Sequence, residues 1–220
     1  MRSDESWMPT LADFEWIESL ARPIHPVLAS LERAATPGNV PILDRDAGRV
    51  LAALASDRRR ICEVGTAIGY STLWMAFGQP ADGHIVTIDP DAARTAVART
   101  HWRTAGIGDK RIEVVNAPAL DAFAAKNPAL AGPFDMVFID ALKDEYGAYL
   151  EALIPRLASG AIVAADNVLW SGRSSGARPS RPGDGTDDLR AFCARVLGDE
   201  RFSGTILPVG DGLLLASFRP

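Results

Sequence analysis

Hydrophobic positions near the start of the chain recur at helical spacing. In "TLADFEWIESL" and "RDAGRVLAALA", apolar residues return every three or four positions, which is typical of amphipathic helices. The stretch "ATPGNVP" between them combines Pro, Gly and Asn and therefore predicts a loop. We expect the first ~60 residues to be helical.

From Arg60 onward, short apolar runs alternate with amphipathic stretches. The runs "RICEV", "HIVTI", "RIEVV", "FDMVFI" and "AIVAA" predict strands. Helices are expected between them over Ser71–Gly78, Asp91–Ala105, Ala119–Lys126 and Tyr146–Leu157. Each is long enough for a right-handed crossover. This alternation predicts an α/β fold with a doubly wound, mostly parallel sheet.

The end of the chain follows a different pattern. "FSGTILPV" and "GLLLASF" flank the turn "GDG" and predict a terminal antiparallel hairpin, which brings the expected sheet to seven strands. Residues Ser171–Gly185, rich in Gly, Pro, Ser and Arg, predict a mobile surface loop. We expect a single domain over residues 1–220, with a helical cap segment over 1–58 and a Rossmann-like core over 59–220.

Composition excludes several functional classes. The 220 residues are 47% hydrophobic and 23% charged, with a net charge of −5, as in a soluble globular domain. No run of basic residues exceeds Arg58–Arg60, so a nucleic-acid partner is not expected. Apolar stretches fall short of the ~18 residues that would suggest a membrane partner. Cys62 and Cys193 have no metal-ligand spacing and no signal peptide precedes them, so a reducing cytoplasm is expected.

The first predicted strand leads into a glycine-containing turn, "EVGTAIGYS". In such a sheet, ligands bind beyond the carboxyl ends of the strands. Gly65 and Gly69 allow a tight turn and close approach to a ligand, and Ser71 falls where free helix N–H groups favour an anion. A plain strand–helix turn is the alternative. The glycine spacing differs from GxGxxG, which disfavours NAD.

An acidic residue, Asp89, ends the second predicted strand 24 residues beyond Gly65. An acid at this place can accept both hydroxyls of a ribose. Alternatively, Asp89 caps the helix expected near Asp91. We favour ribose because of the upstream glycines, and hence an adenosine-containing ligand. Ala117 and Pro118 provide a small surface for an adenine ring.

Oxygen-bearing side chains end the fourth and fifth predicted strands. Asp140 follows "FDMVFI", and Asp166 and Asn167 follow "AIVAA". Neighbouring parallel strands would bring them to one edge, where two carboxylates repel unless a proton or cation lies between them. Such oxygen donors suit Mg²⁺, and the lack of nearby His or Cys disfavours zinc. The alternative is that these side chains are two independent helix or turn caps. This explains less well why both acids appear at equivalent strand ends.

Together these segments carry a family resemblance. "EVGTAIGYSTLWMA", "IVTIDPD", "FDMVFIDALKDEY", "IVAADNVLWSG" and "LPVGDGLLLA" occur in the family's order. The chain resembles the cation-dependent S-adenosylmethionine O-methyltransferases, the family of catechol and caffeoyl-CoA O-methyltransferases. The resemblance implies S-adenosyl-L-methionine and Mg²⁺, or another divalent cation such as Mn²⁺ or Ca²⁺, as cofactors. It also implies a homodimer.

The resemblance also implies roles for individual residues. It implies that the cofactor is bound by Leu43, Glu63, Gly65, Thr66, Gly69, Ser71, Asp89, Ala117 and Asp140. Asp140, Asp166 and Asn167 match its metal ligands, and Lys143, beside Asp140, matches its proton-accepting catalytic lysine. Trp170 matches an aromatic position near the acceptor pocket. Many relatives read "DADK" where this chain reads "DALK", so Leu142 removes a carboxylate from beside the site.

The expected reaction is methyl transfer to one hydroxyl of a small vicinal dihydroxy aromatic. The cation would orient two neighbouring oxygens and lower the hydroxyl pKa from about 10, and Lys143 would remove the proton. The alternatives are a methyltransferase-fold protein that acts on a non-catechol acceptor, or one with a non-catalytic binding role.

Overall fold

Seven strands form one sheet in the computed structural model, which describes residues 9–38 and 41–220. Their order across the sheet is β3-β2-β1-β4-β5-β7-β6. The strands are β1 Arg60–Val64, β2 His84–Ile88, β3 Ile112–Val115, β4 Phe134–Ile139, β5 Leu157–Ala165, β6 Phe202–Leu207 and β7 Leu213–Phe218. The first five run parallel, and β7 is antiparallel to both β5 and β6. The predicted doubly wound sheet with its terminal hairpin is confirmed.

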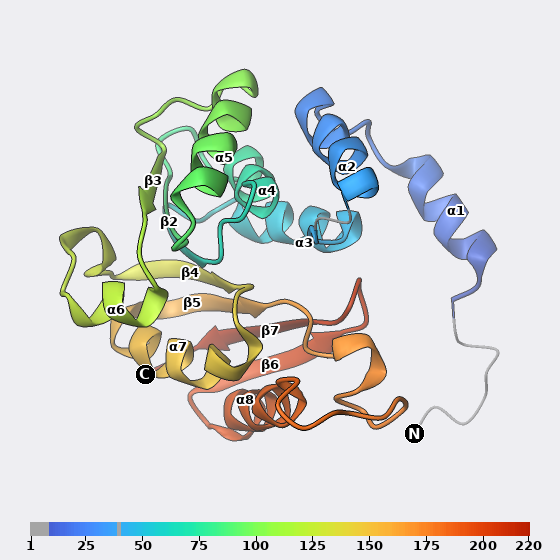
Figure 1. Cartoon of the computed structure of the whole chain (residues 1–220), viewed down its shortest axis with the longest axis vertical. Coiled ribbons are helices and arrows are strands. Elements are labelled where there is room, and N and C mark those ends of the chain that lie inside the picture. Colours follow the sequence, from blue (N-terminus) through green and yellow to red (C-terminus); the bar gives the residue numbers. More distant parts are fainter. Residues whose placement is uncertain (1–8, 39–40) are drawn as a thin grey trace.

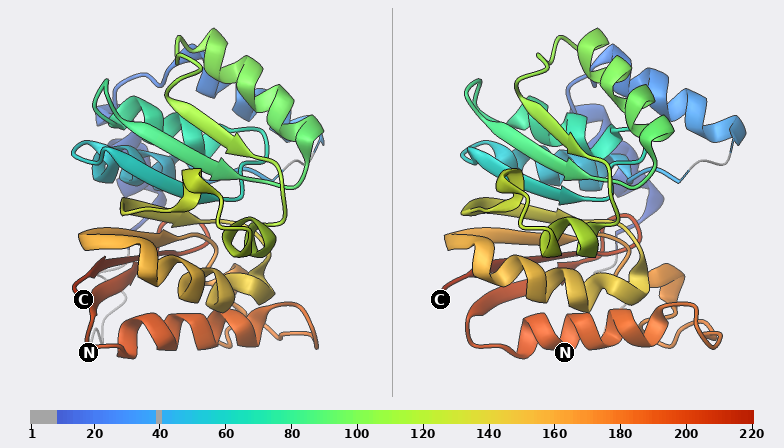
Figure 2. Two further views of the ribbon diagram at one scale, coloured as in Figure 1. Left: turned by 90° about the vertical axis from the view of Figure 1, so that its left-hand side faces the viewer. Right: turned by 60° about the vertical axis from the view of Figure 1, so that its left-hand side comes forward.

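Helices cover both faces of this sheet (Figure 1) (Figure 2). They are α1 Leu11–Leu20, α2 Pro26–Gly38, α3 Arg45–Ala55, α4 Tyr70–Gly78, α5 Ala92–Thr104, α6 Ala119–Ala124, α7 Tyr146–Leu153 and α8 Thr186–Gly198. Helices α6, α7 and α8 pack on one face, and α3, α4 and α5 on the other, where α2 adds its own apolar side chains. No helix in the described part of the chain is long and apolar enough to cross a membrane.

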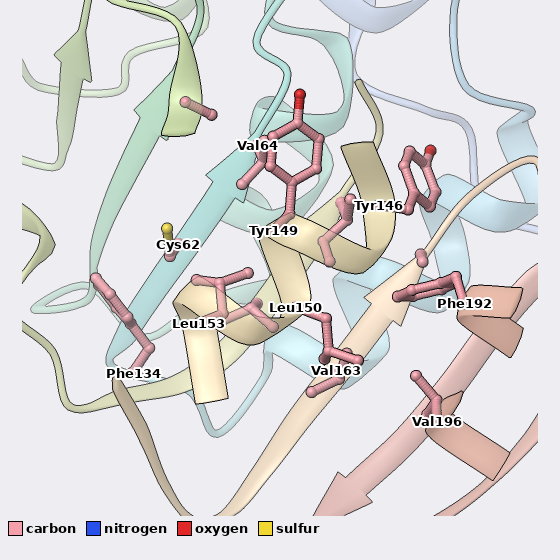
Figure 3. Packing of buried hydrophobic residues seen from close by; sticks show 14 of the residues in the cluster. Cys62, Val64, Phe134, Tyr146, Tyr149, Leu150, Leu153, Val163, Phe192 and Val196 are labelled. Carbon is pink, nitrogen blue, oxygen red and sulfur yellow. The ribbon is translucent and has the colours of Figure 1, made fainter. Parts of the chain in front are cut away.

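Alternation along the strands explains the two cores. In β4, Met136 and Phe138 point to the α3–α5 face, whereas Val137 and Ile139 point to the α6–α8 face. All four are fully buried, because a parallel sheet is covered on both sides. Figure 3 shows side chains of α7 and α8 meeting over the strands. The sheet is therefore a rigid platform for the loops at its carboxyl edge.

Some expectations for the N-terminal region were wrong. Helix α2 continues to Gly38, so the predicted loop over residues 35–41 is largely helical, and residues 39–40 lie outside the described residues. The apolar residues of α1, among them Phe14 and Trp16, are exposed rather than packed. Helix α1 has no buried residue and lies apart from the sheet in Figure 1.

Helix α8 was not expected from the sequence. Its buried residues Leu189, Phe192 and Val196 recur at helical spacing, and this is the signal that could have found it. Residues 171–185 before it form a largely irregular segment, and the indole of the preceding Trp170 donates a hydrogen bond to the carbonyl oxygen of Asp184 (2.8 Å).

A pair of leucines tests the packing of the α6–α8 face. Leu153 in α7 is fully buried, and Leu197 in α8 is 42% exposed. We expect Leu153→Ala to lower the free energy of unfolding by about 2–5 kcal/mol, since it leaves a cavity. Leu197→Ala should change it by less than about 0.5 kcal/mol. Urea unfolding measures both, and equal effects would contradict this packing.

Candidate active site

The carboxyl ends of β1, β2, β4 and β5 lie side by side, because these strands are parallel neighbours. Two cavities open there. The β1–β2 cavity, of about 330 Å³, includes Asp89 and Tyr149 in its lining. The β4–β5 cavity, of about 600 Å³, includes Asp166 and Trp170. The residues lining both are Ala67, Arg94, Asp140 and Ala141. Asp140 therefore faces both cavities.

The turn after β1 is shaped by close contact with β4. Gly65 has a φ of +101°, and a Cβ at this position would overlap the carbonyl oxygen of Asp140. Only glycine accommodates both this conformation and this approach. The turn thus brings the predicted residue Gly65 against the strand end that carries Asp140, whereas the hydroxyl of the predicted residue Thr66 lies 2.6 Å from that of Thr87 on β2.

Asp89 organises the same turn. Its Oδ2 accepts hydrogen bonds from the backbone N–H groups of Thr66 (3.2 Å) and Ala67 (2.8 Å). Its Oδ1 accepts one from the N–H of Asp91 (2.8 Å). Asp91, in turn, caps α5 by accepting from Ala93 and Arg94. The helix cap is therefore Asp91, and Asp89 lines the β1–β2 cavity.

Glu63 lies beneath this turn in a cage of hydroxyl groups. It is fully buried on β1 and accepts hydrogen bonds from the hydroxyls of Ser71, Thr72 and Thr87, each at 2.6 Å. Burial raises the pKa of Glu63 to about 7, and the hydrogen bonds oppose this rise. The predicted residues Glu63 and Ser71 are thus joined directly to each other.

Three other predicted cofactor residues serve packing in this structure. Gly69, with a φ of +80°, begins α4, and a Cβ there would overlap the indole of Trp102. Leu43 is 5% exposed in the core of the α3–α5 face. Within the described part of the chain, Leu43 and Ala117 line neither cavity, although their neighbours Ile42 and Pro118 do.

A hydrogen-bond chain joins the strand ends at the β4–β5 cavity. Lys143 Nζ donates to Asp140 Oδ1 (2.8 Å) and to the hydroxyl oxygen of Tyr146 (2.7 Å). The Tyr146 hydroxyl donates to the carbonyl oxygen of Asp166 (3.1 Å). The structure therefore brings Asp140, Lys143 and Asp166 together.

Asp166 lies in an unfavourable place for a negative charge. It is 3% exposed, and burial followed by the charge of Asp140 raises its pKa to about 7. Asn167 Nδ2 donates to its Oδ2 (3.1 Å). Its Oδ1 is buried and has no hydrogen-bond partner among the described residues. A buried oxygen without a partner needs a compensating proton, water or cation.

These residues fit a divalent cation. Asp140, Asp166 and Asn167 all line the β4–β5 cavity and supply the oxygen atoms that Mg²⁺ prefers. The unpartnered Asp166 Oδ1 supplies an acceptor that the protein leaves unused. Across residues 9–38 and 41–220, no group of three or more His, Cys, Asp or Glu side chains could hold a metal ion. A site here would therefore depend on the amide of Asn167.

Several residues of the site were not predicted from the sequence. Tyr146 is fully buried and holds Lys143, which lies three residues earlier across one helical turn. Arg94 lines both cavities from the first turn of α5. Leu142, 62% exposed, lines the β1–β2 cavity. Among the described residues, Leu142 does not belong to the lining of the β4–β5 cavity. A leucine in place of the Asp common in the family therefore changes the lining of the β1–β2 cavity.

Comparison with known proteins gives a consistent result. Residues 20–218 match the model of an O-methyltransferase family. The chain is 40% identical over 152 residues to a catechol O-methyltransferase of Mycobacterium tuberculosis (strain ATCC 25618 / H37Rv), covering 67% of each chain. It is 33% identical over 176 residues to a catechol O-methyltransferase of Niastella koreensis, covering 77% of this chain and 78% of that one.

A solved structure is similar over the whole chain. The O-methyltransferase TomG from Streptomyces achromogenes, involved in tomaymycin synthesis and crystallised in complex with SAM, superposes with a TM-score of 0.81. The two are 28% identical, and the match covers 100% of each chain.

The buried Glu63 predicts a pH-dependent stability. In the unfolded chain its carboxyl ionises near pH 4.5, whereas the folded chain keeps it protonated up to about pH 7. Wild-type stability should therefore fall as pH rises through this window, by up to about 3 kcal/mol, relative to Glu63→Gln. Urea unfolding at several pH values measures the difference. Glu200→Gln, at an exposed position, is the control, and identical pH profiles for the two variants would contradict the assignment.

Proposed function

Because the chain belongs to the O-methyltransferase family and is an S-adenosylmethionine-dependent O-methyltransferase, we propose that it methylates one hydroxyl of a vicinal dihydroxy aromatic with the help of Mg²⁺. One observation carries the proposal: Asp140, Lys143, Asp166 and Asn167 converge on one cavity, and this cavity adjoins the cavity of Asp89.

The cofactor is proposed to lie in the β1–β2 cavity. Asp89 is the acceptor for one of its ribose hydroxyls, since a carboxylate has about four acceptor sites and the protein uses three. Pro118, Ala119 and Leu142 provide apolar contact for the adenine ring. The methionine end of the cofactor then points toward the residues that line both cavities. Methyl transfer has to occur at this shared wall.

The cation is proposed to bind Asp140, Asp166 and Asn167. When bound, it would hold two vicinal oxygens of the acceptor and favour ionisation of the attacking hydroxyl. The family resemblance supports Mg²⁺, with Mn²⁺ or Ca²⁺ as substitutes. The raised pKa of Asp166 supports this site as well, because a nearby positive charge would favour its ionised form.

Lys143 is proposed to accept the proton of the attacking hydroxyl at Nζ. Its side chain is 12% exposed, and both of its hydrogen-bond partners hold it at the wall of the β4–β5 cavity. Orientation of this kind can lower the barrier by several kcal/mol. Trp170 also lines the cavity and lies beside Lys143, with Nζ 5.8 Å from the ring centre. It gives an aromatic acceptor a flat surface to contact.

The acceptor is proposed to be a small molecule, a view supported by the volume of the β4–β5 cavity, about 600 Å³. The relatives named as catechol O-methyltransferases support a catechol-like acceptor. We also propose a cytoplasmic location, because both cysteines of the chain are free thiols.

The function is tested by transfer from labelled S-adenosylmethionine to a panel of catechols and matched monophenols, with and without EDTA. We expect methylation of the vicinal diols alone and its loss in EDTA. Lys143→Met should lower kcat by about 10²–10⁴-fold, with S-adenosylhomocysteine affinity within about twofold of the wild type. The exposed Lys110→Met is the matched control. Transfer undiminished by EDTA would remove the cation from the proposal, and equal use of monophenols would remove the catechol acceptor.

A homodimer through α1 is proposed as the assembly. The helix exposes a stripe of large apolar residues, Leu11, Phe14, Trp16, Ile17 and Leu20. A second copy of the chain would cover this stripe with an identical one, as in a two-fold symmetric interface. The homodimers usual in the resembling family support this choice of partner.

The α1 interface predicts a change in mass. Phe14→Glu combined with Ile17→Glu should convert the dimer to a monomer in sedimentation experiments, because charged side chains oppose burial of the stripe. Leu197→Glu, which places the same charge at an exposed leucine of α8, should remain dimeric. A monomeric wild type at micromolar concentration would contradict the interface.

A further inference from the structure

The β6–β7 turn, residues Val209–Gly212, contacts a segment that lines the β4–β5 cavity. This segment, residues Asp166–Ser171, follows β5. Its N–H groups at Val168 and Leu169 donate to the carbonyl oxygens of Gly212 (3.0 Å) and Asp211 (2.9 Å). The carboxylate of Asp211 accepts a third hydrogen bond, from the N–H of Ser171 (2.5 Å). Three successive contacts thus join the turn to this segment.

The Asp166–Ser171 segment is strained. Three of its non-glycine residues have positive φ angles: Asn167 at +59°, Trp170 at +50° and Ser171 at +54°. L-residues rarely adopt such angles, and strain of this kind persists only where surrounding contacts maintain it. Asn167 and Trp170 both line the β4–β5 cavity, so the strained conformation determines what this wall presents to a ligand.

The same turn also approaches the segment that carries two other residues of the cavity lining, Pro41 and Ile42. Gly210 approaches Asp44, and a Cβ at Gly210 would lie 2.7 Å from the Asp44 Cβ. Asp44 caps α3 and follows Pro41 and Ile42 closely in sequence, and both of these line the β4–β5 cavity. One short turn therefore contacts two distant parts of the chain, each of which carries residues that line the cavity.

We propose that the β6–β7 turn is a brace for the β4–β5 cavity and that Asp211 is a positioning residue for Asn167 and Trp170. Its carboxylate holds the Ser171 N–H and so maintains the strained backbone that orients these two side chains. The nature of the ligands in this cavity, a divalent cation and an acceptor, rests on the proposed function. The motif "GDG" is thus part of the site and not merely a hairpin turn.

The brace should act on one cavity only. Asn167 and Trp170 line the β4–β5 cavity and, within the described part of the chain, not the β1–β2 cavity. Loss of the Asp211 hydrogen bond should therefore weaken cation and acceptor binding and leave cofactor binding unchanged. A general loss of stability would not weaken binding in one cavity and leave binding in the other unchanged.

Three variants test the brace. Asp211→Ala removes the acceptor for Ser171 N–H, whereas Asp211→Asn keeps an oxygen that can accept the same bond. Asp135→Ala is the matched control, since Asp135 also accepts backbone N–H groups, those of Arg59 and Arg60, at the amino edge of the sheet. Circular dichroism verifies that each variant is folded. If Asp211→Ala does not fold, Asp211→Ser replaces it, because its shorter side chain does not reach the same position.

Two kinds of measurement are needed. Hydrogen exchange of the peptide over residues 166–171 should be faster in Asp211→Ala and close to wild type in Asp211→Asn. The Kd for Mn²⁺, measured by electron paramagnetic resonance, and the acceptor KM should each rise about tenfold in Asp211→Ala. The Kd for S-adenosylhomocysteine should stay within about twofold of the wild type. Asp135→Ala should match the wild type in all four.

The outcomes separate the brace from the proposed function. Unchanged exchange in Asp211→Ala would overturn the brace, and so would faster exchange with unchanged Mn²⁺ and acceptor binding. A parallel loss of S-adenosylhomocysteine affinity would show a general structural role instead and would equally overturn it. A wild type that binds no Mn²⁺ would overturn the proposed cation and the positioning role with it, whereas the exchange result would still report whether the turn holds the segment.

Discussion

Two carboxylates placed close together at the ends of neighbouring strands are the constraint on which the site depends. Asp166 is almost fully buried, and its pKa of about 7 means that keeping it ionised costs on the order of 4 kcal/mol. The backbone N–H of Asn167 and the positive charge of Lys143, which donates to Asp140, relieve part of this cost. Asp166 Oδ1 still lacks a partner in the described part of the protein. A positive charge beside Asp166 would therefore favour its ionised form.

Close backbone packing joins the two cavities. Because Gly65 has no Cβ, the turn after β1 can rest against the carbonyl of Asp140. The result is a shared wall in which Asp140 contributes to both the β1–β2 and the β4–β5 cavity. Two bound molecules would consequently meet at the end of β4. A methyl group passed between them needs such a meeting point, since transfer requires contact between the reacting atoms.

The strands that carry the site residues could be predicted from the sequence more reliably than the contacts of those residues. The strand ends that carry Asp89, Asp140 and Asp166 were predicted correctly, because buried parallel strands read as continuous apolar runs that stop at a polar residue. The contacts of Gly69 and Leu43 were not foreseen. Trp102, more than thirty residues away in sequence, occupies the space beside Gly69. A local sequence pattern does not predict such a long-range contact. Tyr146 was used only to mark a helix, since spacing does not show where a hydroxyl points.

The sequence by itself determined the seven strands, the parallel run of the first five, the antiparallel hairpin and the edge at which polar residues gather, because these follow from the hydrophobic pattern along the chain. The order of the strands across the sheet came from the tertiary structure. Only the tertiary structure decided which of those residues face a cavity. It also decided that α1 exposes its apolar stripe and that Asp211 holds the segment after β5. Such features depend on distances between segments far apart in the chain, and these distances are set by packing over the whole sheet.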